Sequence, residues 1–174
     1  MNETIRTLNM RKSCRSYTDE AVSEEMLDAI LECGTHAASG RNCQAAKLVA
    51  VTNRELVKKL SRMNAKVMGG DGDPFYGAPA VVIVFGCPEG GVTPYQDACL
   101  AMGNMLNAAY SLGLGACYIN RAKEMFESDE GMALLEEWGI TEKLFGVGCM
   151  ILGHIKGELH ADLPRKEGYI VKIQ

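Results

Sequence analysis

The chain has 174 residues, 47% of them hydrophobic and 23% charged, which indicates one globular domain, residues 1–174, rather than a disordered chain. Its net charge of −4 gives no general positive field, which argues against nucleic acid or an anionic membrane surface as a partner. The charged first twenty residues and the lack of about 18 consecutive apolar residues predict a cytoplasmic protein without a membrane-spanning helix.

Hydrophobic spacing and end signals predict alternating helices and strands in the first half of the chain. A short helix should follow Asn2, with Ile5 and Leu8 facing inward. A second helix should begin after Ser23, a favourable N-cap, and stop at Gly34. The expected elements are, in order, a helix at 3–8, a helix at 24–33, a strand at 48–52, a helix at 54–62 and a glycine-rich loop at 64–77.

The second half continues the alternation with more apolar segments. Residues 81–85 are a continuous apolar run rich in β-branched residues, the pattern of a strand buried on both faces. The other expected elements are a helix at 97–112, a strand at 116–119, a helical region at 122–138 broken near 129–131, a strand at 147–152 and an extended tail closing at 171–173. This order indicates a sheet with helices packed on it, and the spacing alone leaves a parallel and a mixed sheet open.

The helix expected at 97–112 has almost no polar face. A helix that is apolar all round is buried on all sides. Two arrangements satisfy that requirement: a central helix wrapped by its own chain, or a helix covered by a partner subunit. The small size of the chain favours the partner subunit.

The seven cysteines are widely spread and include no C-x-x-C pair, so neither zinc spacing nor a disulfide framework is indicated. Most of them lie in apolar runs, which favours reduced, buried thiols that act as small core residues. The chain has only three histidines, and no metal site is expected.

A local concentration of cations follows the first short helix, in the segment Arg11-Lys12-Ser13-Cys14-Arg15-Ser16-Tyr17. If the segment is extended, Arg11, Ser13 and Arg15 share one face. Guanidinium groups bind phosphate through paired donors, so this face suits an anionic ligand. A solvated basic loop has the same local composition and stays open as the alternative.

Two further segments carry polar groups where the chain should be open. Ala38-Ser39-Gly40-Arg41-Asn42-Cys43-Gln44 lies between the first long helix and the first strand, where its hydroxyl and amide groups can bond a ligand or form an ordinary polar turn. The glycine-rich stretch 112–120 follows a helix and precedes a strand, the reverse of the dinucleotide-binding context, so it is not a Rossmann fingerprint.

Together these segments resemble the nitroreductase family. Residues 11–17 resemble that family's R-[RH]-S-x-[RK]-x-[FY] signature, and residues 38–44 resemble its P-S-x-x-N-x-Q segment. The run 97–115 is similar to the family's central helix and glycine-rich exit, while 148–153 and 164–166 match its last core strand and basic tail. The resemblance covers nearly the whole chain in the right order.

The resemblance implies an α+β fold with a central mixed or antiparallel sheet flanked by helices, assembled as an intertwined homodimer with FMN at the subunit interface. It assigns Arg11 and Arg165 to the FMN phosphate, and Arg15 to a place beside flavin N1 and O2, where a positive charge stabilises the reduced flavin. The other implied cofactor-binding residues include Lys12, Ser13 and Gln44, with Tyr118, Ile119 and Asn120 near flavin N5. Ser39 and Asn42 would come from the second subunit.

The implied activity is that of an FMN-dependent oxidoreductase. NADH or NADPH would pass a hydride to flavin N5, and a small-molecule acceptor such as a nitroaromatic or a quinone would take the electrons in a ping-pong cycle. No side chain is required as acid or base. The alternatives are a flavin-binding sensor or carrier without turnover, and thiol chemistry at Cys14 or Cys43.

Two departures from the family pattern bear on the substrate. Ala38 stands where the family usually has proline, and Ala45-Ala46 stands where it usually has Pro-Trp. Loss of the tryptophan removes bulk near the pocket. The glycine-rich loop 69–77 is then the expected variable wall of the pocket.

Overall fold

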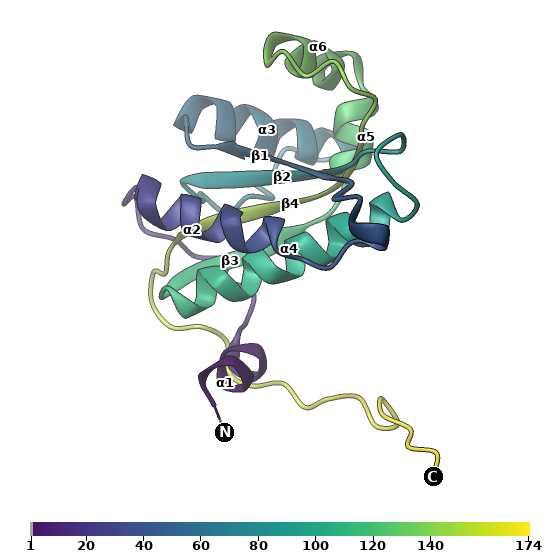
Figure 1. Cartoon of the computed structure of the whole chain (residues 1–174). Coiled ribbons are helices and arrows are strands. Elements are labelled where there is room, and N and C mark those ends of the chain that lie inside the picture. Colours follow the sequence, from purple (N-terminus) through teal and green to yellow (C-terminus); the bar gives the residue numbers. More distant parts are fainter. Residues whose placement is uncertain (1) are drawn as a thin grey trace.

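The computed structural model describes residues 2–174 and shows one four-stranded sheet between two layers of helices (Figure 1). The strands are β1 (Ala46–Val51), β2 (Ala80–Gly86), β3 (Leu114–Ile119) and β4 (Phe145–His154). The helices are α1 (Glu3–Met10), α2 (Glu24–Thr35), α3 (Arg54–Val67), α4 (Pro94–Ser111), α5 (Ala122–Glu127) and α6 (Asp129–Glu137), with a short 3-10 turn, η1, at Gly40–Asn42.

The sheet has the strand order β1-β2-β4-β3, and every neighbouring pair is antiparallel. This confirms the antiparallel option of the expected fold. Strand β2 is buried along its whole length, as the apolar run at 81–85 predicts. Strands β1 and β3 form the two edges of the sheet.

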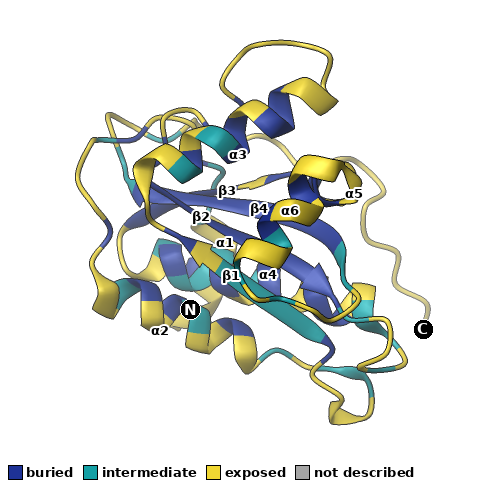
Figure 2. Ribbon diagram, turned by 90° about the horizontal axis from the view of Figure 1, so that it is seen from above, coloured by how far each residue is buried: buried dark blue, intermediate teal, exposed yellow. Residues whose placement is uncertain are grey.

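The two faces of the sheet carry separate layers of the core. Alternate side chains of a strand point to opposite faces, so Val81, Ile83 and Phe85 pack beneath α3 and α5, and Val82 and Val84 pack against α2 and α4. Figure 2 shows the buried strands enclosed by helices whose outer surfaces are exposed.

The sequence patterns place most elements correctly, with differences at the ends. Helix α3 continues past Arg62 to Val67, because Met63, Asn64 and Ala65 are buried and hold its last turns against the core. The predicted inward orientation of Ile5 and Leu8 is wrong within this chain, because their side chains are 47% and 55% exposed. The tail at 171–173 is exposed and forms no strand.

The cysteines are less buried than expected. All seven are free, but only Cys14, Cys117 and Cys149 are buried, whereas the others are partly or largely exposed. The expectation of core thiols therefore holds for these three and is wrong for the rest. Apolar flanking residues do not decide burial when a cysteine lies on the outer side of a helix, as Cys33 and Cys99 do.

Helix α4 packs on the sheet through one face only. Ala98, Met102 and Met105 are buried, whereas Leu100 on the opposite side of the helix is 50% exposed. Tyr95, in the first turn, is 54% exposed although its ring stacks on Phe145 of β4. The chain therefore does not wrap its own central helix, which removes one of the two predicted arrangements. Among the described residues, no helix is long and apolar enough to cross a membrane.

Candidate functional site

The basic segment 11–17 runs beside the start of β3, held there by main-chain bonds. Ser13 forms a parallel bridge with Ala116, and the Cys14 amide donates to the Ala116 carbonyl at 3.0 Å. A side chain at Gly115 would lie 2.6 Å from the Cys14 sulfur, so glycine permits this close approach. The buried Cys14 thus fastens the segment, which leaves Ser13 and Arg15 on the more open side.

The cations of this segment lie next to the C-terminal tail. Lys12 forms an ion pair with Asp162 at 2.9 Å. This hydrogen bond and the charge of Lys12, with a smaller contribution from Arg165, lower the pKa of Asp162. The carboxylate of Asp162 therefore connects the basic segment with the tail that carries Arg165. Arg11 is the C-cap of α1, where the backbone becomes extended and continues into Lys12 and Ser13.

The predicted variable loop is anchored by Asp73. Its carboxylate accepts hydrogen bonds from Ser61 and from the amides of Phe75 and Gly77. The next turn places Tyr76 in a left-handed conformation with φ of 53°. The ring of Tyr76 lies 6.0 Å from the Arg15 guanidinium, a cation–π distance, so this loop forms a wall beside Arg15.

Ser39, Asn42 and Gln44 form one compact hydrogen-bonded turn at the end of η1. The backbone amide of Gln44 donates to Ser39 Oγ at 3.1 Å, and its side-chain Nε2 donates to Asn42 Oδ1 at 3.2 Å. The φ angles of Arg41, Asn42 and Gln44 are 54°, 55° and 52°. Left-handed backbone costs a residue other than glycine roughly 1–3 kcal/mol, and such strain is concentrated at functional sites.

A buried carboxylate holds this turn against α4. Asp97 is 4% exposed and accepts from the Gly40 amide at 3.0 Å, from Thr93 Oγ1 at 2.9 Å and from the Ala45 amide at 3.4 Å. Burial alone would raise the pKa of Asp97, but the hydrogen bonds from Gly40, Thr93 and Ala45 outweigh it and lower the pKa. Asp97 is therefore ionised at neutral pH.

Tyr118 lies flat against β4. Its ring covers Gly148, where a Cβ would lie 2.4 Å from the ring, and its hydroxyl donates to the Val147 carbonyl at 2.7 Å. Burial, with Tyr95 and Cys99 nearby, raises the pKa of Tyr118, so the phenol stays protonated. The side chain of Ile119 belongs to the core on the other face of the sheet, so only its backbone is available to a ligand.

The turn after β3 is fixed from beneath by Asn64. This fully buried amide donates to the Asn120 carbonyl at 2.8 Å and accepts from Arg121 Nε at 3.0 Å. Arg121 has a φ of 79°, which is unusual for a residue with a side chain. The contacts from Asn64 hold the backbone of Asn120 and Arg121 in this conformation.

The structure gathers these residues into two groups at opposite ends of the sheet. Ser13, Ala116 and Ala80 share one row of the sheet, whereas the segment before β1 ends beside Cys87, seven residues further along the strand. Seven residues span about 23 Å, and the three strand spacings between β1 and β3 span about 14 Å. Within one chain, Ser39 and Asn42 therefore do not meet Ser13 and Arg15.

Three residues of these networks are missing from the sequence prediction. Asp97 is read from the sequence as the start of a helix, but it lies one turn inside α4, which begins after Thr93. Asn64 is read as the start of a loop because α3 is predicted to end too early. Arg121 gives no sequence signal for positive φ, which only glycine and asparagine suggest. No group of residues suited to a metal ion exists among residues 2–174.

Comparison with known proteins agrees with this architecture. The family model described as "Nitroreductase family" matches residues 8–70 and 68–154. A protein of Archaeoglobus fulgidus whose name includes NAD(P)H nitroreductase is 31% identical over 163 residues, 91% of this chain and 88% of that one. The FMN reductase [NAD(P)H] of Bacillus subtilis is 29% identical, over 88% of this chain and 66% of that protein.

A solved structure shows the same fold along the whole chain. The crystal structure of a nitroreductase with bound FMN from Bacteroides fragilis has a TM-score of 0.90 and 29% identity, and the match covers 100% of both chains. The sequence resemblance, the family model and the antiparallel sheet agree, and the chain belongs to the nitroreductase family.

Proposed function

We propose that this protein is an FMN-dependent oxidoreductase that takes electrons from NADH or NADPH and delivers them to a nitroaromatic, a quinone or a similar small acceptor in a ping-pong cycle. The observation that carries the proposal is the basic segment fastened to β3, with Ser13 and Arg15 on its open side. Relatives named FMN reductase and a neighbour with bound FMN support the choice of cofactor.

The residues present fit FMN in their chemistry. A phosphate requires cationic and hydroxyl donors, which Arg11, Lys12, Ser13 and Arg165 supply. In this structure Lys12 is paired with the carboxylate of Asp162, and Arg165 acts on the same carboxylate through its charge. Three of these four donors are cations, so the donor set retains capacity for an anion.

The remaining residues would hold the flavin ring and exclude water from it. Bound FMN supplies the two-electron chemistry that side chains cannot perform. Arg15, whose guanidinium lies 6.0 Å from the Tyr76 ring, would place a positive charge beside the pyrimidine edge of the flavin. The fixed backbone of Asn120 and the protonated Tyr118 would line the ring near N5. Ser39, Asn42 and Gln44 would reach it from a second subunit.

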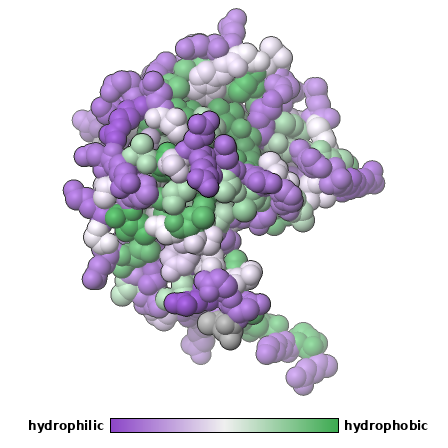
Figure 3. Space-filling model, turned by 60° about the vertical axis from the view of Figure 1, so that its left-hand side comes forward, coloured by the Kyte–Doolittle hydropathy of each residue, from purple (hydrophilic) through white to green (hydrophobic). Residues whose placement is uncertain are grey.

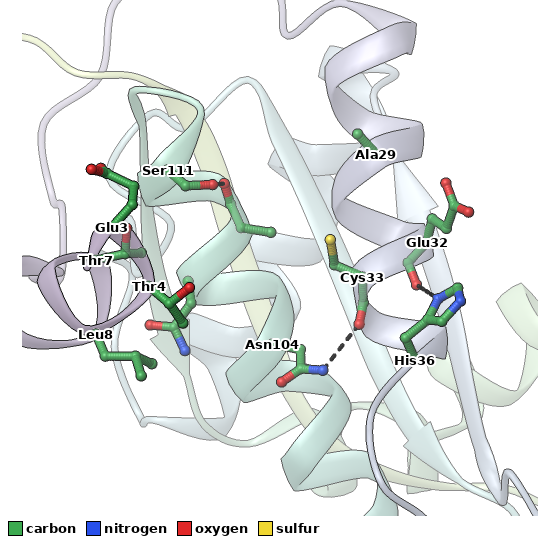
Figure 4. Close-up of a pocket in the computed structure, with 12 residues that line it drawn as sticks. Glu3, Thr4, Thr7, Leu8, Ala29, Glu32, Cys33, His36, Asn104 and Ser111 are labelled. Carbon is green, nitrogen blue, oxygen red and sulfur yellow. Dashed lines mark hydrogen bonds between the residues drawn. The ribbon is translucent and has the colours of Figure 1, made fainter.

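A homodimer would complete the site, and the surface of α4 supports it. Helices α1, α2 and α4 enclose an apolar groove of about 790 Å³, into which Leu8 of α1, Cys33 of α2 and Asn104 of α4 project (Figure 4). Two further apolar side chains of α4, Tyr95 and Leu100, are exposed outside this groove. We assign this surface to a second copy of the chain, because the two halves of the flavin site lie too far apart in one copy.

The C-terminal tail supports an intertwined form of that dimer. It leaves the body of the protein with apolar side chains along it (Figure 3). Leu163, Tyr169, Ile170, Val171 and Ile173 are each at least 74% exposed. Apolar residues in such a row usually mark an interaction surface. Burial against a second copy would cover them, and the free cysteines fit the expected cytoplasmic location.

Anaerobic mixing of the FMN-loaded protein with NADPH, and separately with NADH, tests the function. We expect bleaching of the flavin absorbance near 450 nm, roughly the oxidised flavin maximum, followed by recovery when a quinone or nitroaromatic is added. Flavin that binds but is reduced by neither nucleotide would instead indicate a sensor or carrier. Protein that binds no FMN would contradict the proposal.

A further inference from the structure

The buried carboxylate of Asp97 connects two parts of the chain that are far apart in sequence. Its partners Gly40 and Ala45 precede it by 57 and 52 residues. An acidic residue in the first turn of a helix usually interacts with the helix's own free amides. The two oxygens of Asp97 instead accept from amides on either side of the turn at 40–45, so the carboxylate spans that turn.

The turn is held in a conformation that its own residues disfavour. Arg41, Asn42 and Gln44 are all left-handed, and none of them is glycine. Left-handed backbone in such residues persists only when surrounding contacts enforce it. Gly40 lies so close to Thr93 that a Cβ would be 2.1 Å from Thr93 Oγ1. The contacts that enforce the turn therefore converge on Asp97 and its neighbour Thr93.

We propose that Asp97 is a positioning residue for the cofactor site, which holds Ser39 and Asn42 in the conformation that meets the flavin of the partner subunit. The proposal rests on the proposed function, because it assigns these two side chains to FMN. Asp97 itself is buried and is not assigned a contact with FMN. Its effect passes through the turn, whose hydroxyl and amide groups are arranged before FMN arrives.

Asp97→Asn is the direct test. The amide has nearly the same shape, but it replaces one acceptor oxygen with an NH2 group that cannot accept from the Gly40 or Ala45 amide. Asp129→Asn is the matched control, because Asp129 is an exposed carboxylate in the first turn of α6. Both variants lose one negative charge near a helix N-terminus.

Two measurements separate the role of Asp97 from simple stabilisation. Hydrogen exchange of the FMN-free protein should show lost protection at residues 40–45 in Asp97→Asn and not in Asp129→Asn. FMN titration at a temperature well below unfolding should show affinity at least about tenfold weaker for Asp97→Asn, which corresponds to about 1.4 kcal/mol. The control should bind FMN within about twofold of the wild type.

A second substitution tests the strain directly. Glycine adopts left-handed backbone without steric cost, so Arg41→Gly should restore part of the FMN affinity in the Asp97→Asn background. Asp97→Asn could lose thermal stability and yet keep its FMN affinity and the visible circular dichroism of the bound flavin. That result would overturn the inference about Asp97 and leave the proposed function standing. Wild-type protein that binds no FMN would overturn the proposed function and the inference together.

Discussion

Replacement of Asn64 by alanine should destabilise the protein strongly, although Asn64 is a single polar side chain near the end of a helix. Its amide is fully buried and bonds to the Asn120 carbonyl and to Arg121 Nε. A neutral hydrogen bond contributes about 1 kcal/mol and one to a charged group about 1.5–3 kcal/mol, while the partners left behind lose their solvation. We therefore expect Asn64→Ala to lower the free energy of unfolding by roughly 2–4 kcal/mol.

Urea denaturation of the FMN-free protein, at one fixed protein concentration, measures this loss. The matched control is Asn53→Ala, because Asn53 caps the same helix and its side chain accepts from the Leu56 amide at 3.0 Å. Loss of such an exposed cap costs about 1 kcal/mol. FMN affinity should fall in Asn64→Ala and stay unchanged in Asn53→Ala. A loss of stability in Asn64→Ala no larger than that in the control would refute the reasoning.

Three further predictions concern charge, assembly and thiol chemistry. Arg15→Gln should lower the midpoint potential of the bound flavin in a spectroelectrochemical titration by roughly 30 mV, which is about 1.4 kcal/mol for two electrons; an unchanged potential would place Arg15 away from the ring. Leu100→Asp on the exposed face of α4 should yield monomers by analytical ultracentrifugation and abolish FMN binding, whereas a monomer that binds FMN normally would contradict the shared site. Burial raises the pKa of the Cys149 thiol to about 12, so this thiol should resist alkylation at pH 8 until the protein is unfolded, and mass spectrometry of the labelled native protein checks it.

Local signals were enough to predict most of the fold. Asn2 and Ser23 stand at helix starts and do accept from amides of the first turn, and the run 81–85 is the buried central strand. These features depend on neighbours a few residues away, which the sequence displays directly. The strand order depends on contacts between distant segments and was not predicted; the resemblance to a family supplied only the mixed or antiparallel character of the sheet.

The residues proposed to face the ligand carry chemistry that the sequence displays, whereas the residues that support them do not. Ser39, Asn42 and Gln44 carry groups whose chemistry is visible in the sequence. Asp97 looks like an ordinary acidic residue near a helix start, and its role depends on a main-chain turn that begins 57 residues earlier. Residue type does not report the φ of Arg41 either, because strain is a property of the surrounding fold.

The position of the turn also explains why supporting residues of this kind are needed. Ser39 and Asn42 lie across the sheet from Ser13 and Arg15, so they can act on a flavin only at the interface with a second copy. A turn that meets a ligand across an interface loses conformational freedom when it binds, and order imposed beforehand reduces that cost. Asp97 supplies the order from α4, the helix whose opposite face is open to a partner. Formation of the dimer and preparation of the flavin site would thus depend on the same helix.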